Sequence, residues 1–154
     1  MKWMRTAWLL LALGGAVTAQ TPSPRSAVNV LHRSNPAVAW DITSAKIADV
    51  DCDGHPDTLM LGYEKDQVAV GIVPGSKRQP QVLLFPIKAG RQDGFCAKPQ
   101  AINISPLSCD DDGGPLTGCK VIAGCEEFSI PDEGCDAFNF YWDASRATVA
   151  WRRH

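Results

Sequence analysis

The chain has 154 residues, a formal net charge of −2 at pH 7 and 45% hydrophobic residues. This length suits one domain with its own core. The slightly acidic balance argues against nucleic acid as a partner, because that interaction needs a basic surface. Six cysteines, an even number, indicate an exported protein with up to three disulfides.

The N-terminus has the pattern of a cleavable signal peptide. A basic start at Lys2 and Arg5 precedes a short apolar run, and Val17 and Ala19 are small residues at the −3 and −1 positions. The run is too short for a comfortable membrane span. We therefore expect residues 1–19 to be a signal peptide, 20–25 a disordered lead-in and 26–154 a single β domain. The mature chain is expected to be secreted or periplasmic, without a membrane anchor.

Short apolar segments predict strands in the first half of the domain. Candidate strands cover residues 26–31, 38–42 and 44–48, with a turn at Asn35 and Pro36. Residues 58–64, 67–73 and 81–87 follow, separated by turn residues. Residues 67–73 are apolar on both faces, which suits a central strand. Residues 47–87 thus predict an antiparallel meander.

An aspartate-rich loop separates residues 44–48 from 58–64. Its acids alternate along the chain, with Gly54 where a sharp turn needs a residue without Cβ. Calcium takes roughly 6–8 oxygen ligands, and alternate carboxylates in a coiled loop supply them. An EF-hand loop would need glutamate where this chain has Met60, and a helix instead of the apolar strand that follows. A polar turn is the alternative, but four acids within nine residues would repel one another without a cation.

The loop and the strand after it resemble the calcium loop of FG-GAP and VCBS-type repeats, found in integrin α-subunit propellers. The resemblance covers roughly residues 47–73. It implies a calcium ion bound by the side chains or, for His55, the backbone carbonyl of five residues: Asp49, Asp51, Asp53, His55 and Asp57. Only one copy is present, whereas a propeller needs about four or more blades. The expected fold is therefore mainly β, a small antiparallel sheet or sandwich and not a full propeller.

Residues 88–134 are rich in Gly, Pro, Asp and Cys and predict a disulfide-rich loop region. Six cysteines allow 15 pairings; of these we expect Cys52–Cys96, Cys109–Cys119 and Cys125–Cys135. The acids at 110–112 are consecutive, so their side chains point in different directions. We interpret them as a solvated acidic loop.

The C-terminal residues predict a β-hairpin. Residues 138–142 and 147–151 are rich in aromatic and β-branched side chains. They are expected to pack on the sheet core. A second interpretation is an exposed edge in which Tyr141 or Trp151, with Arg152 and Arg153, contacts a partner or a sugar.

No motif identifies an enzyme. The sequence has no Gly-x-Ser-x-Gly element and no phosphate-binding glycine loop. His32 has no recognisable partner motif. We therefore expect an exported calcium-binding β domain that acts by binding, either as a protein inhibitor or on a cell-surface protein or glycan. The alternative is a secreted hydrolase that uses acids between Asp110 and Asp136, since a glycosidase needs only two carboxyl groups.

Overall fold

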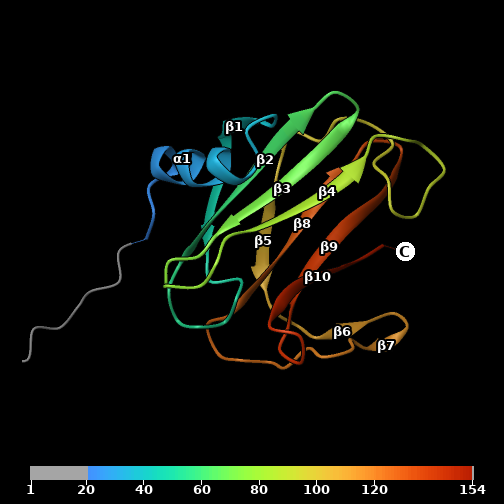
Figure 1. The fold of residues 1–154 in the computed structure, drawn as a ribbon. Coiled ribbons are helices and arrows are strands. Elements are labelled where there is room, and N and C mark those ends of the chain that lie inside the picture. Colours follow the sequence, from blue (N-terminus) through green and yellow to red (C-terminus); the bar gives the residue numbers. More distant parts are fainter. Residues whose placement is uncertain (1–20, 154) are drawn as a thin grey trace, which may run out of the picture.

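The computed structural model describes residues 21–153, so the predicted signal peptide lies outside the described residues. Two four-stranded antiparallel sheets lie face to face, with one helix on the outside of the first sheet (Figure 1). The mainly β sandwich expected from the sequence is confirmed. No helix in this described part of the chain has the length and apolar character needed to cross a membrane.

The first sheet is the predicted meander, with the order β1-β2-β3-β4. Its strands are β1 Ala39–Ala48, β2 Asp57–Glu64, β3 Gln67–Val73 and β4 Gln81–Pro86. The apolar β3 is central, as predicted. Residues 38–42 and 44–48 were expected as two strands but form β1 alone, because a bulge between Asp41 and Lys46 lets one strand continue past the polar residues there.

The second sheet has the order β10-β9-β8-β5. Its strands are β5 Asn103–Pro106, β8 Glu126–Asp132, β9 Cys135–Asp143 and β10 Thr148–Arg152. Strands β9 and β10 are the predicted C-terminal hairpin, paired from Thr148 opposite Asp143 to Arg152 opposite Asn139. Within the cysteine-rich region, the acidic stretch forms a small hairpin of β6 Asp110–Asp111 and β7 Gly114–Pro115.

The core lies between the two sheets. Leu59, Leu61 and Val70 of the first sheet are fully buried and belong to the same apolar cluster as the phenylalanines of the second sheet. Phe128 and Phe140 stack with ring centroids 4.5 Å apart. Burial of such large side chains is the main stabilising contribution to a sandwich of this size. The packed core therefore fixes the strands from whose ends the loops extend.

The expectation of a strand at residues 26–31 is wrong, because these residues lie in helix α1, Pro24–Ser34. The Ser23 side chain accepts a hydrogen bond from the Ser26 N–H, and Pro24 suits the first helical turn. Ala27 and Leu31, four residues apart, are buried against the outer face of the sheet. A Cβ at Gly71 would lie 2.6 Å from Leu31 Cδ1, so glycine there makes room for the helix. The helix begins inside the lead-in that was expected to be disordered.

Two of the three predicted disulfides are wrong. Cys109–Cys119 is confirmed, but the other cysteines pair as Cys52–Cys125 and Cys96–Cys135 instead of Cys52–Cys96 and Cys125–Cys135. The observed pairs join positions that are 73 and 39 residues apart in the sequence and that meet only when the sheets assemble. All six cysteines are paired, which indicates an oxidising, extracellular type of environment.

Candidate metal centre

The aspartate-rich loop connects β1 to β2 at one end of the first sheet (Figure 1). The two strands are paired up to Ala48 opposite Asp57, so Asp57 begins β2 while Asp49 directly follows β1. Between them the chain coils tightly, with positive φ at Cys52 (57°) and Gly54 (84°). This coil brings the carboxylates of Asp49 and Asp51 close to that of Asp57.

Three of the predicted ligands come together there. One carboxylate oxygen from each of Asp49, Asp51 and Asp57 lies within 4.8 Å of the other two. Asp57 is fully buried and Asp51 is 2% exposed. Three carboxylates this close are unfavourable unless a proton or a cation neutralises part of their charge.

Two of these aspartates also shape the loop through hydrogen bonds to its backbone. Asp57 accepts hydrogen bonds from the N–H groups of Val50 (3.0 Å), Asp51 (3.2 Å) and Gly75 (3.0 Å). The two carboxylate oxygens of Asp49 accept from the N–H groups of Asp53 (3.2 Å) and Gly54 (2.9 Å). These side chains therefore hold the backbone around the centre, as Asx-type turns do.

Asp51 differs from both. Neither of its carboxylate oxygens accepts a hydrogen bond, although both are buried. Its nearest cationic group is Arg78, whose Nη1 lies 3.3 Å from Oδ2. Burial, followed by the charges of Asp57 and Asp53, raises the pKa of Asp51 to about 7. Burial also raises the pKa of Asp57 to about 6. A buried carboxylate without hydrogen bonds is costly, and a bound cation would remove that cost.

The remaining two predicted ligands, Asp53 and His55, lie outside the group of three carboxylates. One of the Asp53 oxygens accepts from the His55 N–H at 2.9 Å. His55 is exposed on the outside of the loop. Its proposed role requires only the backbone carbonyl, so the exposed imidazole does not conflict with that prediction.

Sequence reasoning missed three residues that shape this centre. Glu126, at the start of β8, accepts from the Asp49 N–H at 3.1 Å and donates its own N–H to the Asp49 carbonyl at 2.9 Å. Next to it, Cys125 is bonded to Cys52 within the loop. Arg78 reaches in from the segment between β3 and β4. All three are distant in sequence, so no local pattern indicates them.

The donor set fits a hard cation. The grouped atoms are carboxylate oxygens, with neither thiolate nor imidazole among them. Oxygen ligands suit calcium, magnesium and manganese, whereas zinc and copper sites use sulfur and nitrogen. Asp49, Asp51 and Asp57 are thus the residues that would hold such an ion.

A second acidic group, at Asp132, has a different character. Asp132 accepts hydrogen bonds from the N–H groups of Cys96 (2.8 Å) and Ala97 (3.1 Å) and pairs with Arg153 Nη2 at 2.7 Å. Cys96 and Cys135 beside it are consumed by their disulfide. Both carboxylate oxygens of Asp132 have hydrogen-bond partners, so this group is a closed ion pair.

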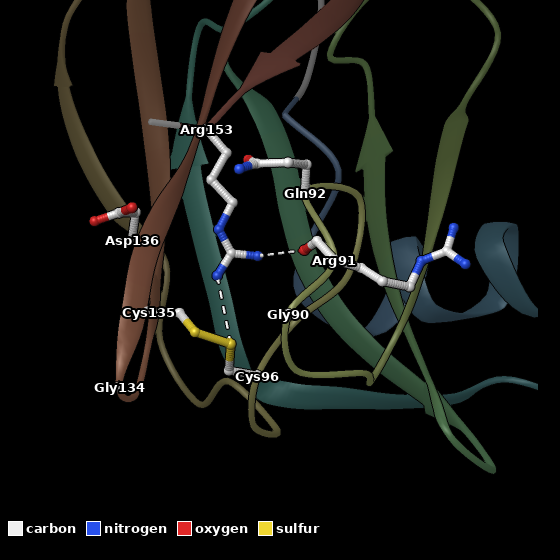
Figure 2. Close-up of a pocket in the computed structure, with 8 residues that line it drawn as sticks. All are labelled: Gly90, Arg91, Gln92, Cys96, Gly134, Cys135, Asp136 and Arg153. Atoms are coloured by element: carbon white, nitrogen blue, oxygen red, sulfur yellow. Dashed lines mark hydrogen bonds between the residues drawn. A yellow bond between two sulfur atoms is a disulfide. The ribbon is translucent and has the colours of Figure 1, made fainter.

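An open hollow of about 330 Å³ lies next to that ion pair. Figure 2 shows the guanidinium of Arg153 directed toward the Arg91 carbonyl (3.4 Å) and toward Cys96 Sγ (3.7 Å). Asp136 is the single carboxylate that lines this hollow. It therefore lacks the facing pair of acids that a glycosidase would use.

The acidic stretch at 110–112 and the predicted aromatic-basic edge meet in one ion pair. Asp110 and Asp112 are exposed, and Asp111 pairs with Arg152 at 2.7 Å. Trp151 is 37% exposed and packs edge-on against Phe85. The predicted aromatic-basic edge is thus largely engaged in internal contacts.

Comparison with known proteins does not place the chain in a family. The chain has no significant match among protein-family models, curated proteins or solved structures.

Proposed function

We propose that the protein is an exported β domain with one structural calcium ion, and that it acts by binding another protein. The observation that carries this proposal is Asp51, a buried carboxylate without a hydrogen bond between two further carboxylates. Calcium would supply the missing partner of Asp51 and neutralise its neighbours. Extracellular modules often bind calcium at about 10⁻⁴–10⁻³ M, a range that suits an ion with a structural role.

The proposed ligands are the carboxylates of Asp49, Asp51 and Asp57, completed by Asp53 and the backbone carbonyl of His55. Two antiparallel strands flank the loop, which agrees with the resemblance to a single FG-GAP or VCBS-type repeat. In that arrangement the ion would tie the end of β1 to the start of β2. Through Cys52–Cys125 and Glu126 it would also tie the loop to the second sheet.

A short segment beside this loop is the best candidate for contact with a partner. Residues 120–124 are all exposed, and Val121 and Ile122 are 70% and 41% exposed. The segment lies between Cys119 and Cys125, each fixed by a disulfide. Anchoring at both ends lowers the entropy cost of binding, and exposed aliphatic side chains favour a protein partner over a glycan.

Thermal unfolding of the chain from Gln20 tests the calcium site. A ligand that binds only the folded state raises the midpoint, and a hundredfold excess over the dissociation constant adds about 2.7 kcal/mol of stability. We expect a clear rise when excess calcium replaces EDTA. Asp49→Ala should abolish that rise, whereas Asp112→Ala, in the exposed acidic hairpin, should retain it. An unchanged midpoint in the unsubstituted protein, or equal calcium responses in both variants, would refute the site.

Export is proposed on the signal-peptide pattern together with the three disulfides. Cleavage after Ala19 predicts that the protein recovered from an oxidising compartment begins at Gln20, which N-terminal mass spectrometry measures. Recovery with Met1 in place would contradict this part of the proposal.

A further inference from the structure

We infer that Arg78 is an internal counter-cation that competes with calcium for Asp51 and is displaced when the ion binds. This inference rests on the calcium site proposed above. It adds a regulatory element to that site, because the position of Arg78 would then report whether the ion is bound.

The contacts of Arg78 place its charge on the loop. Nη1 lies 3.3 Å from Asp51 Oδ2 and donates to the Asp51 backbone carbonyl at 3.0 Å. Nε lies 3.8 Å from an oxygen of Asp53. The guanidinium therefore neutralises part of the negative charge at which calcium would bind, and two cations at this distance repel each other.

The ion pair between Arg78 and Asp51 is weak enough for a bound cation to break it. The Arg78 side chain is 45% exposed, so its charge can move into water without a large desolvation cost. Arg153 provides the contrast: its side chain is 5% exposed, and it pairs with Asp132 at 2.7 Å. Arg78 makes a single long contact with the Asp51 carboxylate, whereas strong arginine–carboxylate pairs are short and bidentate.

Displacement of Arg78 would alter one loop and one aromatic ring. Arg78 belongs to the connection between β3 and β4, and its Cζ lies 5.0 Å from the centre of the Trp142 ring. At the near end of this connection, the Gly75 N–H is bonded to Asp57, so the movement would be confined to residues 76–80. Trp142 is 6% exposed, and its emission would change when the cation above it leaves.

Calcium titration calorimetry at pH 7.5 on the chain from Gln20 tests this competition. Arg78→Met removes the charge and keeps an apolar stem of similar length, so it should bind calcium roughly tenfold more tightly. Arg78→Lys keeps the charge and should bind within about threefold of the unsubstituted protein. The control Arg146→Met removes an arginine that is 73% exposed and pairs with Asp143; it should leave the affinity unchanged.

Tryptophan fluorescence supplies a readout that does not depend on affinity. Calcium should change the emission of the unsubstituted protein, and Trp142→Phe should remove this change. Arg78→Met should also lack most of it, because no cation leaves the ring. Thermal unfolding in EDTA verifies that each variant is folded.

The outcomes separate this inference from the calcium site itself. Equal or weaker calcium binding by a folded Arg78→Met variant would overturn the competition and assign Arg78 a positioning role, while the site would stand. An absence of calcium binding by the unsubstituted protein would overturn both. Tighter binding by Arg78→Met together with loss of the emission change supports the inference.

Discussion

Two buried aspartates, Asp51 and Asp132, have similar surroundings and different partners. Each lies beside a disulfide and an arginine, and their side chains are 2% and 0% exposed. Asp132 accepts backbone N–H groups and a short bond from the buried Arg153. Asp51 accepts no hydrogen bond, and its arginine is half exposed and 3.3 Å away.

The difference shows that burial of a carboxylate does not by itself indicate a metal site. What distinguishes the two positions is whether the oxygens already have partners. At Asp132 the protein supplies all of them, so the residue is structural. At Asp51 further negative charges from Asp49 and Asp57 surround oxygens that lack donors, which supports the cation proposed there.

The largest expected effect concerns the buried ion pair of Asp132 and Arg153. Asp132→Asn should lower the free energy of unfolding by about 3–5 kcal/mol, because it leaves Arg153 buried without a counter-charge. Denaturant unfolding measures this loss, and the calcium-induced rise in midpoint should persist. Asp136→Asn, at an exposed residue that lines the hollow next to this pair, should change stability by less than about 0.5 kcal/mol. A loss of similar size from both variants would show that the buried pair of Asp132 and Arg153 contributes no more to stability than an exposed aspartate.

The next effect concerns pH and has opposite signs with and without calcium. The pKa values of Asp51 and Asp57 are raised to about 7 and about 6, so the folded state binds more protons than the unfolded state between about pH 4 and 7. In EDTA, stability should therefore fall as pH rises through this window, by on the order of 3 kcal/mol for Asp57 alone. Urea unfolding at pH 4 and 7.5 measures the change.

With saturating calcium the trend should reverse, because the ion needs deprotonated ligands. The variant Asp51→Asn should show a weaker pH dependence in EDTA than the unsubstituted protein. Stability that rises with pH in EDTA to the same extent in both proteins would contradict the assignment of these raised pKa values to the loop.

The smallest effect concerns Asp51 alone. Asp51→Asn keeps the shape of the side chain and removes a repulsive charge, so at pH 7.5 in EDTA it should stabilise the protein by about 1 kcal/mol. The same substitution should remove the calcium response. Thermal unfolding in EDTA and in calcium measures both changes. A destabilised variant that still responds to calcium would mean that Asp51, like Asp132, has a structural role and is not a calcium ligand.

Much of this protein follows from local sequence. The alternating aspartates around Gly54 indicate an oxygen-lined loop, since side chains and a flexible glycine within nine residues meet wherever the chain coils. The strands of the meander and the C-terminal hairpin are also predictable, because antiparallel neighbours are joined by short turns. Cys109–Cys119, which closes a separation of ten residues, belongs to the same local class.

Helix α1 was predicted incorrectly although its signals are also local. Ser23 and Pro24 form a helix start, and Ala27 and Leu31 have helical spacing. The apolar residues between them equally fit a strand, and short apolar runs are ambiguous between the two. Packing against Met60 and the space left by Gly71 decide in favour of the helix.

Only the tertiary structure decided which distant groups reach the loop. Arg78, Glu126 and Cys125 arrive from other strands and connections, and their positions depend on how the two sheets stack. The same stacking supplies Arg153 to Asp132 and leaves Asp51 without a donor. Residue type and spacing determine which oxygens lie near one another along the chain. Which of these oxygens lack a hydrogen-bond donor depends on long-range packing, because burial and hydrogen bonding are properties of the assembled fold.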